Sequence, residues 1–254
     1  MEQVEVGVML PGATVFDDEN LNLTYKAHVR THRETTVAYV KLIPLREIYV
    51  ECVCAVVGRY LGLPIPKPII VSVDSTYLEG IKDGQYKLAF GAEDATYPSF
   101  KRRTRDDEEA YVRLEQFKKT LDVGVFDEWI GNYDRNSGNI LYDGSNDFVF
   151  IDHGVALDPA LEPETIVEHN HIVDVLFAVK TEFEKFKLNR EVQSTITPQY
   201  PALPYSLISE KTYGTSYLSA DEVIHVVNLL EQRSKHLNSL FKNRLRIQQQ
   251  ELVI

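Results

Sequence analysis

One stretch near the start of the chain alternates apolar and polar residues in the manner of a half-buried β-strand. In residues 23–30, apolar residues occupy alternate positions and polar or basic residues lie between them. This is the two-residue period of a strand. A second predicted strand, which is mostly apolar, covers residues 36–43, and the polar residues 31–35 between the two are typical of a turn. The pattern therefore predicts a β-hairpin, with a further strand over residues 4–10.

A long apolar run follows the predicted hairpin. Residues 46–62 are too apolar for a surface helix, and Gly62 and Pro64 are stop signals at the end of the run. We predict a buried helix here, and then two strands over residues 69–73 and 85–90.

The second half of the chain has mainly helical spacing. Apolar residues in 164–188 recur at helical intervals and predict one helix. Ser219 and Glu222 form the Ser-x-x-Glu pattern of a capping box, which predicts the start of a long amphipathic helix. No internal repeat is visible.

Composition and charge narrow the function classes. Hydrophobic residues make up 44% of the chain and charged residues 26%, as in ordinary globular proteins. The formal net charge of -11 argues against direct nucleic-acid binding, which needs a basic face. No apolar run approaches the ~20 residues of a transmembrane helix, so no membrane association is expected.

The two cysteines and the first residues indicate a compartment. Cys52 and Cys54 are two residues apart on a predicted helix, point in different directions, and are expected to be core thiols in a reducing cytosol. The opening M-E-Q-V-E-V-G shows no secretory signal. We therefore expect a cytoplasmic protein.

Candidate chemistry is concentrated between residues 126 and 155. Asp134 is followed five positions later by Asn139, and the apolar run 147–151 leads to Asp152. This is the spacing of a phosphotransferase catalytic loop, in which the first acid receives the hydroxyl proton. The amide and the later acid hold magnesium against the ATP phosphates. The alternative is a polar hairpin around Asp143-Gly144 whose side chains cap turns.

Two residues earlier in the chain fit the same chemistry. Lys41 lies in the apolar strand V-A-Y-V-K-L-I, where an ammonium is costly without an anion. Glu51 lies in the predicted buried helix and needs a cation for the same reason. A phosphate-gripping lysine paired with a helix glutamate meets both needs. The alternatives are a lysine on a solvent face and an exposed stripe that contains Glu47 and Glu51.

These motifs together resemble the HipA-like atypical serine/threonine kinase family, which is distantly related to phosphatidylinositol kinases. The resemblance is carried by V-K-L-I, V-E-C-V-C-A-V-V-G-R-Y-L-G-L-P-I-P, F-D-E-W-I-G-N-Y-D-R-N-S-G-N-I-L and F-I-D-H-G. It covers roughly residues 36–66 and 122–157. It implies Lys41 on the ATP phosphates with Glu51 as its partner. It also implies catalysis by Asp134, and Mg²⁺ ligands at the two positions Asn139 and Asp152.

The resemblance also implies an α+β, two-lobed protein-kinase-like fold. We expect a small β-rich N-lobe over residues 1–90 and a mostly helical C-lobe over residues 91–254. Adenine in a kinase bonds to backbone between the lobes, so we place the candidate hinge and cofactor contacts at Leu88, Phe90 and Ala92.

This sequence departs from the protein-kinase pattern in the loop that covers the nucleotide. No Gly-x-Gly-x-x-Gly precedes the predicted lysine strand. The basic turn of the first hairpin, with Arg30, His32 and Arg33, is either phosphate-facing or a solvated charged turn. Farther on, basic residues at 101–105 precede acids at 106–109 that suit a helix start. The basic run either contacts an acidic substrate or is a solvated loop.

The function expected from these observations is transfer of the ATP γ-phosphate, with Mg²⁺, to a protein Ser or Thr hydroxyl. A small-molecule or lipid kinase uses the same acid–amide–acid trio and is the alternative within enzymes. The alternative of another class is a nucleotide-binding pseudokinase that acts as an interaction module. Larger members of the family are toxins that partner a DNA-binding antitoxin, so an antitoxin or regulatory partner is a further expectation.

Overall fold

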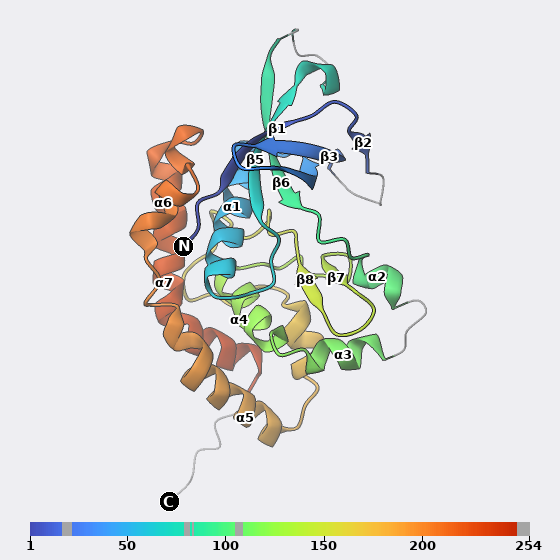
Figure 1. Ribbon diagram of the computed structural model, residues 1–254. Helices are drawn as coiled ribbons and strands as arrows, with labels where there is room; N and C mark the ends of the chain where they lie inside the picture. The colour runs from blue at the N-terminus through green and yellow to red at the C-terminus, as the bar shows by residue number, and fades with distance from the viewer. Residues whose placement is uncertain (17–21, 79–81, 83, 105–108, 248–254) are drawn as a thin grey trace, which may run out of the picture. The chain divides into compact units, whose positions relative to one another are not determined.

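The computed structural model describes residues 1–16, 22–78, 82, 84–104 and 109–247. The chain forms two compact units, each built from segments that are separate in the sequence. The first unit is β-rich and the second is mostly helical (Figure 1). The first comprises Met1–Pro98, Val149–Gly154 and Ser206–Val223, and the second comprises Ser99–Phe148, Val155–Tyr205 and Ile224–Ile254. The expected boundary after residue 90 falls within the strand Tyr86–Glu93, which lies wholly in the first unit.

The sheet of the first unit closes on itself. Its order is β1-β5-β6-β4-β3-β2, and β1 pairs in parallel with β5 and antiparallel with β3. Five strands therefore form a ring, and β2 adds to β3 alone. The hairpin predicted from the residue pattern is β3–β4. The strands are β1 Glu5–Met9, β2 Thr14–Val15, β3 Thr24–Thr31, β4 Thr35–Lys41, β5 Pro68–Asp74 and β6 Tyr86–Glu93.

The interior of this ring is narrow, and two glycines make it possible. A Cβ on Gly7 would lie 2.6 Å from the side chain of Val29, and a Cβ on Gly91 would lie 2.7 Å from the side chain of Val71. A larger residue at either position would force the strands apart. The ring is filled by small and β-branched side chains, among them Ala27, Val29, Ala38, Val40, Val71 and Ala89.

Helix α1 (Leu45–Tyr60) packs outside the ring and is buried on more than one side. Ile48, Cys52 and Val56 pack with Ile70 and Phe90 of the sheet in a second hydrophobic core. The late segment 206–223 covers another part of the helix: Gly214 lies against the ring of Tyr49, and Tyr217 meets the same ring edge-on at 6.3 Å between centroids. This double burial explains why the helix sequence is apolar all round.

The second unit consists mainly of helices and includes part of a small hairpin, whose last two residues, Val149 and Phe150, belong to the first unit. Strands β7 (Ile140–Tyr142) and β8 (Phe148–Phe150) pair around the predicted Asp143-Gly144 turn, where Gly144 has φ 94°. The unit's α-helices are α2 Phe100–Arg103, α3 Ala110–Gln116, α4 Thr120–Ile130, α5 Glu182–Glu191 and most of α7 Ala220–Arg244. Short α6 (Ile208–Lys211) belongs to the first unit. Turns of 3-10 helix span Ser75–Tyr77, Thr197–Gln199, Tyr205–Leu207 and Gly214–Ser216, and π-helical turns span Val173–Phe177 and Val192–Ile196.

Helix α7 holds the end of α4 that leads into the candidate catalytic loop. The Trp129 indole N–H donates to the Leu230 carbonyl at 3.0 Å, and Arg233 donates to the carbonyls of Trp129 and Glu128, both at 2.7 Å. Gly131, at φ 71°, then ends α4 in a left-handed conformation. Each of these contacts fixes the point at which the chain leaves the helix.

The single helix predicted over residues 164–188 is wrong. The structure has a π-helical turn at Val173–Phe177, a break, and then α5. The break occurs because Thr181 forms a capping box with Glu184 and starts a new helix. The capping box at Ser219 and Glu222 is confirmed at the start of α7. Arg105 and the predicted acidic helix start at 106–108 lie outside the described residues.

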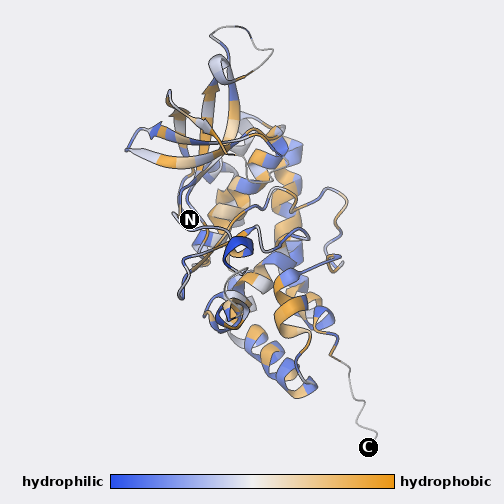
Figure 2. Cartoon of the chain, turned by 90° about the vertical axis from the view of Figure 1, so that its right-hand side faces the viewer, coloured by the Kyte–Doolittle hydropathy of each residue, from blue (hydrophilic) through white to orange (hydrophobic). Residues whose placement is uncertain are grey.

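The hydropathy of the chain follows this packing (Figure 2). Apolar residues concentrate inside the ring, along α1 and on one side of α7, whose other side is polar. None of the helices in the described part of the chain has the length and apolar character needed to cross a membrane.

Candidate active site

A lysine and two carboxylates meet in the first unit. Lys41 ends β4, and its Nζ lies 3.5 Å from Glu51 Oε1 on α1 and 2.9 Å from Asp152 Oδ1. The side chains of Lys41 and Glu51 are 16% and 2% exposed, whereas that of Asp152 is 42% exposed. The predicted Lys41–Glu51 ion pair is therefore present. The shorter contact with Asp152 was not predicted.

Glu51, rather than Glu47, forms the ion pair with Lys41. Glu51 Oε2 also accepts the backbone N–H of His153 at 3.0 Å. Burial by itself would raise the pKa of the Glu51 carboxyl, but the Lys41 charge and the contacts with His153 outweigh it and lower the pKa to about 2. Burial and the nearby charges of Glu51 and Asp152 raise the pKa of Glu47, one helical turn earlier. Glu51 is thus the charged partner of the lysine.

Asp152 has an unusual backbone and a free oxygen. It follows β8 with φ 64°, the left-handed region that non-glycine residues seldom adopt. Such a conformation costs about 1–3 kcal/mol and is found chiefly at functional sites. Lys41 occupies Oδ1, and Oδ2 has no partner among the described residues. Asp152 therefore has a strained backbone, and its Oδ2 is available to a ligand.

The second unit brings Asp134 and Asn139 together in the loop after α4. Asn139 Nδ2 donates to the Asp134 backbone carbonyl at 2.9 Å and lies 3.5 Å from Asp134 Oδ2. Asn136 reinforces the turn, since its Oδ1 accepts the Gly138 N–H at 2.8 Å. The Asp134 carboxylate is exposed. With its nitrogen committed to the loop, Asn139 has only its side-chain oxygen available to bind a cation.

A buried ion pair, which sequence reasoning missed, holds this loop. Arg135 donates from Nε and Nη2 to the two oxygens of Asp127, both at 2.9 Å, and both side chains are 0% exposed. Arg135 Nη1 also donates to the Asn139 carbonyl at 3.0 Å, and Asn132 Nδ2 donates to Asp127 at 3.1 Å. Arg135 therefore ties the end of the loop to α4. The available signal was an acid inside the apolar helix, with an arginine directly after Asp134.

The oxygen donors fit magnesium. The partnerless Asp152 Oδ2 and Asn139 Oδ1 are hard ligands of the kind that Mg²⁺ takes alongside phosphate and water. The described residues contain no group of three or more His, Cys, Asp or Glu side chains that could enclose a metal. Asp152 belongs to the first unit and Asn139 to the second.

The candidate hinge residues lie in β6. Phe90 and Ala92 lie within β6 and pair with β5 on one side and β4 on the other, while Leu88 pairs with β5. Their side chains belong to, or pack on, the core beneath α1. Phe90 and Ala92 therefore have a strand on each side, whereas Leu88 has a paired strand on one side only. The chain leaves the sheet only after residue 93, in segment 94–98.

The basic turn lies at the far end of the hairpin from Lys41. In the β3–β4 ladder, Arg30 pairs with Thr35 at the turn and Thr24 pairs with Lys41 at the opposite end. Six residue steps of about 3.4 Å separate the two ends, or about 20 Å. Arg33 instead lies 3.6 Å from buried Glu5. The turn is therefore a structural contact within the first unit.

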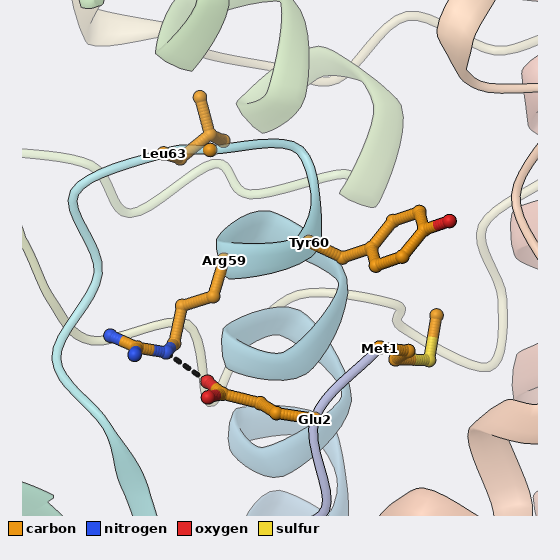
Figure 3. Close-up of a pocket in the computed structure, with 6 residues that line it drawn as sticks. Met1, Glu2, Arg59, Tyr60 and Leu63 are labelled. Carbon is orange, nitrogen blue, oxygen red and sulfur yellow. Dashed lines mark hydrogen bonds and ion pairs between the residues drawn. The ribbon is translucent and has the colours of Figure 1, made fainter.

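A surface hollow of about 440 Å³ lies elsewhere, at the end of α1 (Figure 3). Arg59 is ion-paired with Glu2 there and donates to the Ile65 carbonyl at 2.7 Å. Tyr60 points away from this pair in Figure 3. No candidate site residue lines the hollow, and its charged side chains already bind each other. The Glu2–Arg59 ion pair attaches the N-terminal segment to α1, and we assign no chemistry to the hollow.

Comparisons with known proteins agree on the class of this chain. The family model described as HipA-like kinase matches residues 32–202. Among solved structures, the Helicobacter pylori proinflammatory kinase CtkA matches with a TM-score of 0.58 and 15% sequence identity. The match covers 94% of this chain and 96% of that one. No curated protein matches. The solved structure supports a kinase-like fold, and the family model, which spans more than half of the chain, shows that this protein belongs to the HipA-like kinase family.

Proposed function

We propose that this protein is a two-lobed, ATP- and Mg²⁺-dependent kinase that phosphorylates a Ser or Thr hydroxyl of a protein. The observation that carries the proposal is the position of Lys41 between buried Glu51 and half-exposed Asp152. In a member of a kinase family, this arrangement suits a cation that grips phosphate beside a carboxylate that binds metal.

The residues of the first unit bind the nucleotide. Glu51 keeps Lys41 charged and directed, and the Lys41 ammonium binds the phosphate oxygens. Asp152 contributes its free oxygen to the metal. Adenine would bond to backbone at 88–92 or in the adjoining segment 94–98, where the N–H groups of Asp94 and Thr96 already have acceptors. When bound, Mg²⁺ neutralises phosphate charge during transfer.

The residues of the second unit act on the acceptor. Asp134 aligns the attacking hydroxyl and accepts its proton as the bond to phosphorus forms. Asn139 supports Asp134 through its amide nitrogen and contributes its oxygen to the metal. Arg135 and Asp127 position both residues without contacting the substrate.

The test compares nucleotide affinity with transfer rate in the variant Asp134→Asn. We expect affinity for ATP, measured by calorimetry, to stay near the wild-type value, because Lys41 and Asp152 remain. Transfer to a protein or peptide acceptor should fall about 10²–10⁴-fold, the usual cost of losing a general base. Asp147→Asn, at an exposed acid just before β8, is the matched control.

Three results would contradict the proposal in different ways. Equal loss of affinity and rate in Asp134→Asn would make Asp134 a structural or metal residue. Wild-type turnover in Asp152→Ala would remove Asp152 from the metal site. Nucleotide binding without transfer to any acceptor would favour the pseudokinase, and transfer only to small molecules or lipids would favour that alternative.

A further inference from the structure

We propose that Lys101, Arg102 and Arg103 of α2 form a docking surface for an acidic protein segment that carries the accepting hydroxyl. The inference rests on the proposed function, because it assigns the substrate class of the same site. The evidence comes entirely from the second unit, which holds both α2 and the candidate catalytic loop.

Helix α2 is a fixed part of the second unit. Phe100, its first residue, is fully buried, and its ring packs against Tyr142 and Phe148 at 5.8 and 5.9 Å between centroids. Ser99, just before the helix, forms a β-bridge with Leu141. The three basic residues therefore extend from an anchored base.

The helix is bonded directly to the candidate catalytic loop. The Lys101 N–H donates to the Ser137 carbonyl at 2.9 Å, and Ser137 is three residues after Asp134. Three residues span at most about 10 Å, and the hydrogen bond adds about 3 Å more, so helix α2 begins within about 15 Å of Asp134. An extended peptide rises about 3.3 Å per residue. Acids two to five positions from the accepting hydroxyl would therefore reach these cations.

The charge of α2 contrasts with the rest of the chain. The formal net charge is -11, yet all three basic side chains of α2 are exposed. The Arg103 guanidinium lies over the β7–β8 turn, where a Cβ on Gly144 would come within 3.3 Å of its Cζ. An arginine supported in this way presents its donors in the geometry that carboxylates bind. The ATP phosphates have their own cation, Lys41, and do not need α2.

The observations favour a protein acid over nucleic acid as the bound anion. Three cations on one short helix are few for a polyanion, and the surrounding charge of the chain repels one. A Ser-containing protein segment with acids near its hydroxyl matches the sign of the charge on α2 and the expected chemistry of Asp134. Tyr133, next to Asp134 and 45% exposed, adds an aromatic contact of the type common at protein interfaces.

The binding experiment uses the full chain and three labelled serine peptides with acidic, neutral or basic flanks. Fluorescence anisotropy should show the acidic peptide binding about 5- to 50-fold more tightly than the neutral one, since exposed ion pairs contribute modestly each. Raising the salt concentration from 0.05 to 0.5 M should erase the difference. The triple variant Lys101→Gln/Arg102→Gln/Arg103→Gln should erase it at low salt.

The matched control is Lys187→Gln/Arg190→Gln/Lys235→Gln, which removes three exposed charges elsewhere in the same unit. It should retain the preference for the acidic peptide. Equal loss in both triple variants would reduce the effect to net charge and overturn the inference. Thermal unfolding checks that the α2 variant is folded. We expect it to be, because the variant keeps the buried Phe100 that anchors α2.

Phosphate transfer by the wild type separates this inference from the proposed function. Transfer to the neutral peptide at the same kcat/KM as to the acidic one would overturn the inference and leave the kinase proposal standing. Binding of the acidic peptide through α2 with no transfer from ATP to any acceptor would overturn the proposed function. Binding of a single-stranded oligonucleotide through α2, with no preference among the peptides, would identify nucleic acid instead.

Discussion

The two ion-pair clusters of this protein differ in how firmly they are closed. Asp127 and Arg135 of the second unit are wholly buried and joined by two hydrogen bonds of 2.9 Å. Lys41 of the first unit is shared between buried Glu51 and a carboxylate of Asp152 that is 42% exposed. The first pair has no vacancy for a ligand, whereas the second has an accessible oxygen. The comparison teaches that the buried, bidentate pair is suited to holding the loop, whereas the partly exposed cluster is open to a ligand.

The largest expected effect comes from breaking the closed pair. Arg135→Met leaves the Asp127 charge buried alone, which costs about 3–5 kcal/mol. Chemical denaturation should show this loss in the free energy of unfolding. The double variant Asp127→Leu/Arg135→Met removes both charges and should recover most of it, yet phosphate transfer should stay low because the Asn139 carbonyl has lost its donor. Recovery of transfer together with stability would make the pair merely structural.

The open cluster should make stability depend on acidic pH. The pKa of Glu51 is lowered from its usual 4.5 to about 2 in the folded chain. The stability that this carboxylate contributes is therefore fully present above pH 4.5 and lost as pH falls from 4.5 toward 2. The loss is at most about 3 kcal/mol. Denaturation at several pH values should show a shallower slope in this range for Glu51→Gln, and an unchanged slope would contradict the assignment.

Removing the shared lysine should affect binding more than folding. In Lys41→Met, Glu51 still accepts the His153 N–H, so the free energy of unfolding should fall by only about 1–2 kcal/mol. ATP affinity should fall at least tenfold, because one phosphate contact is charge-assisted. Calorimetry and denaturation on the same preparation measure both. A stability loss as large as that of Arg135→Met, with unchanged affinity, would erase the distinction between the clusters.

The smallest expected effect is at Glu47. Its pKa is raised in the folded chain by burial and by the charges of Glu51 and Asp152. Its charged form is therefore slightly unfavourable at neutral pH, and Glu47→Gln should stabilise the fold by about 0.5 kcal/mol. Thermal unfolding at pH 7 measures the gain. A loss of nucleotide affinity in this variant would show that Glu47 shares the role given to Glu51.

Sequence reasoning succeeded where a local pattern determines structure. The residue pattern predicted the β3–β4 hairpin. A lysine and a glutamate, each in an apolar segment where an unpaired charge is unfavourable, predicted the Lys41–Glu51 contact. The Asp143-Gly144 turn and the Ser219 capping box also depend on neighbouring residues only. Each of these features can be read within a few positions of the chain.

Non-local features were missed because no short pattern encodes them. The pairing of β1 with β3 depends on Gly7 fitting against Val29, two residues that are far apart in the sequence. The Asp127–Arg135 pair needs a turn of known geometry between its members. Apolar spacing over 164–188 does not reveal that Thr181 caps a new helix, so the single predicted helix is too long. The role of each predicted site residue stays a prediction that the variants above can decide.

The order in which the segments of the first unit are synthesised has a consequence for folding on the ribosome. The five-stranded ring is complete once residue 98 has emerged, but the covering of α1 by residues 206–223 must wait for more than a hundred further residues. Contacts between such distant positions form slowly, because a long loop must close first. During translation, Tyr49 and its neighbours on α1 therefore remain open to solvent and to chaperones. A chain truncated after residue 98 would keep that surface uncovered, and aggregation would be its expected fate.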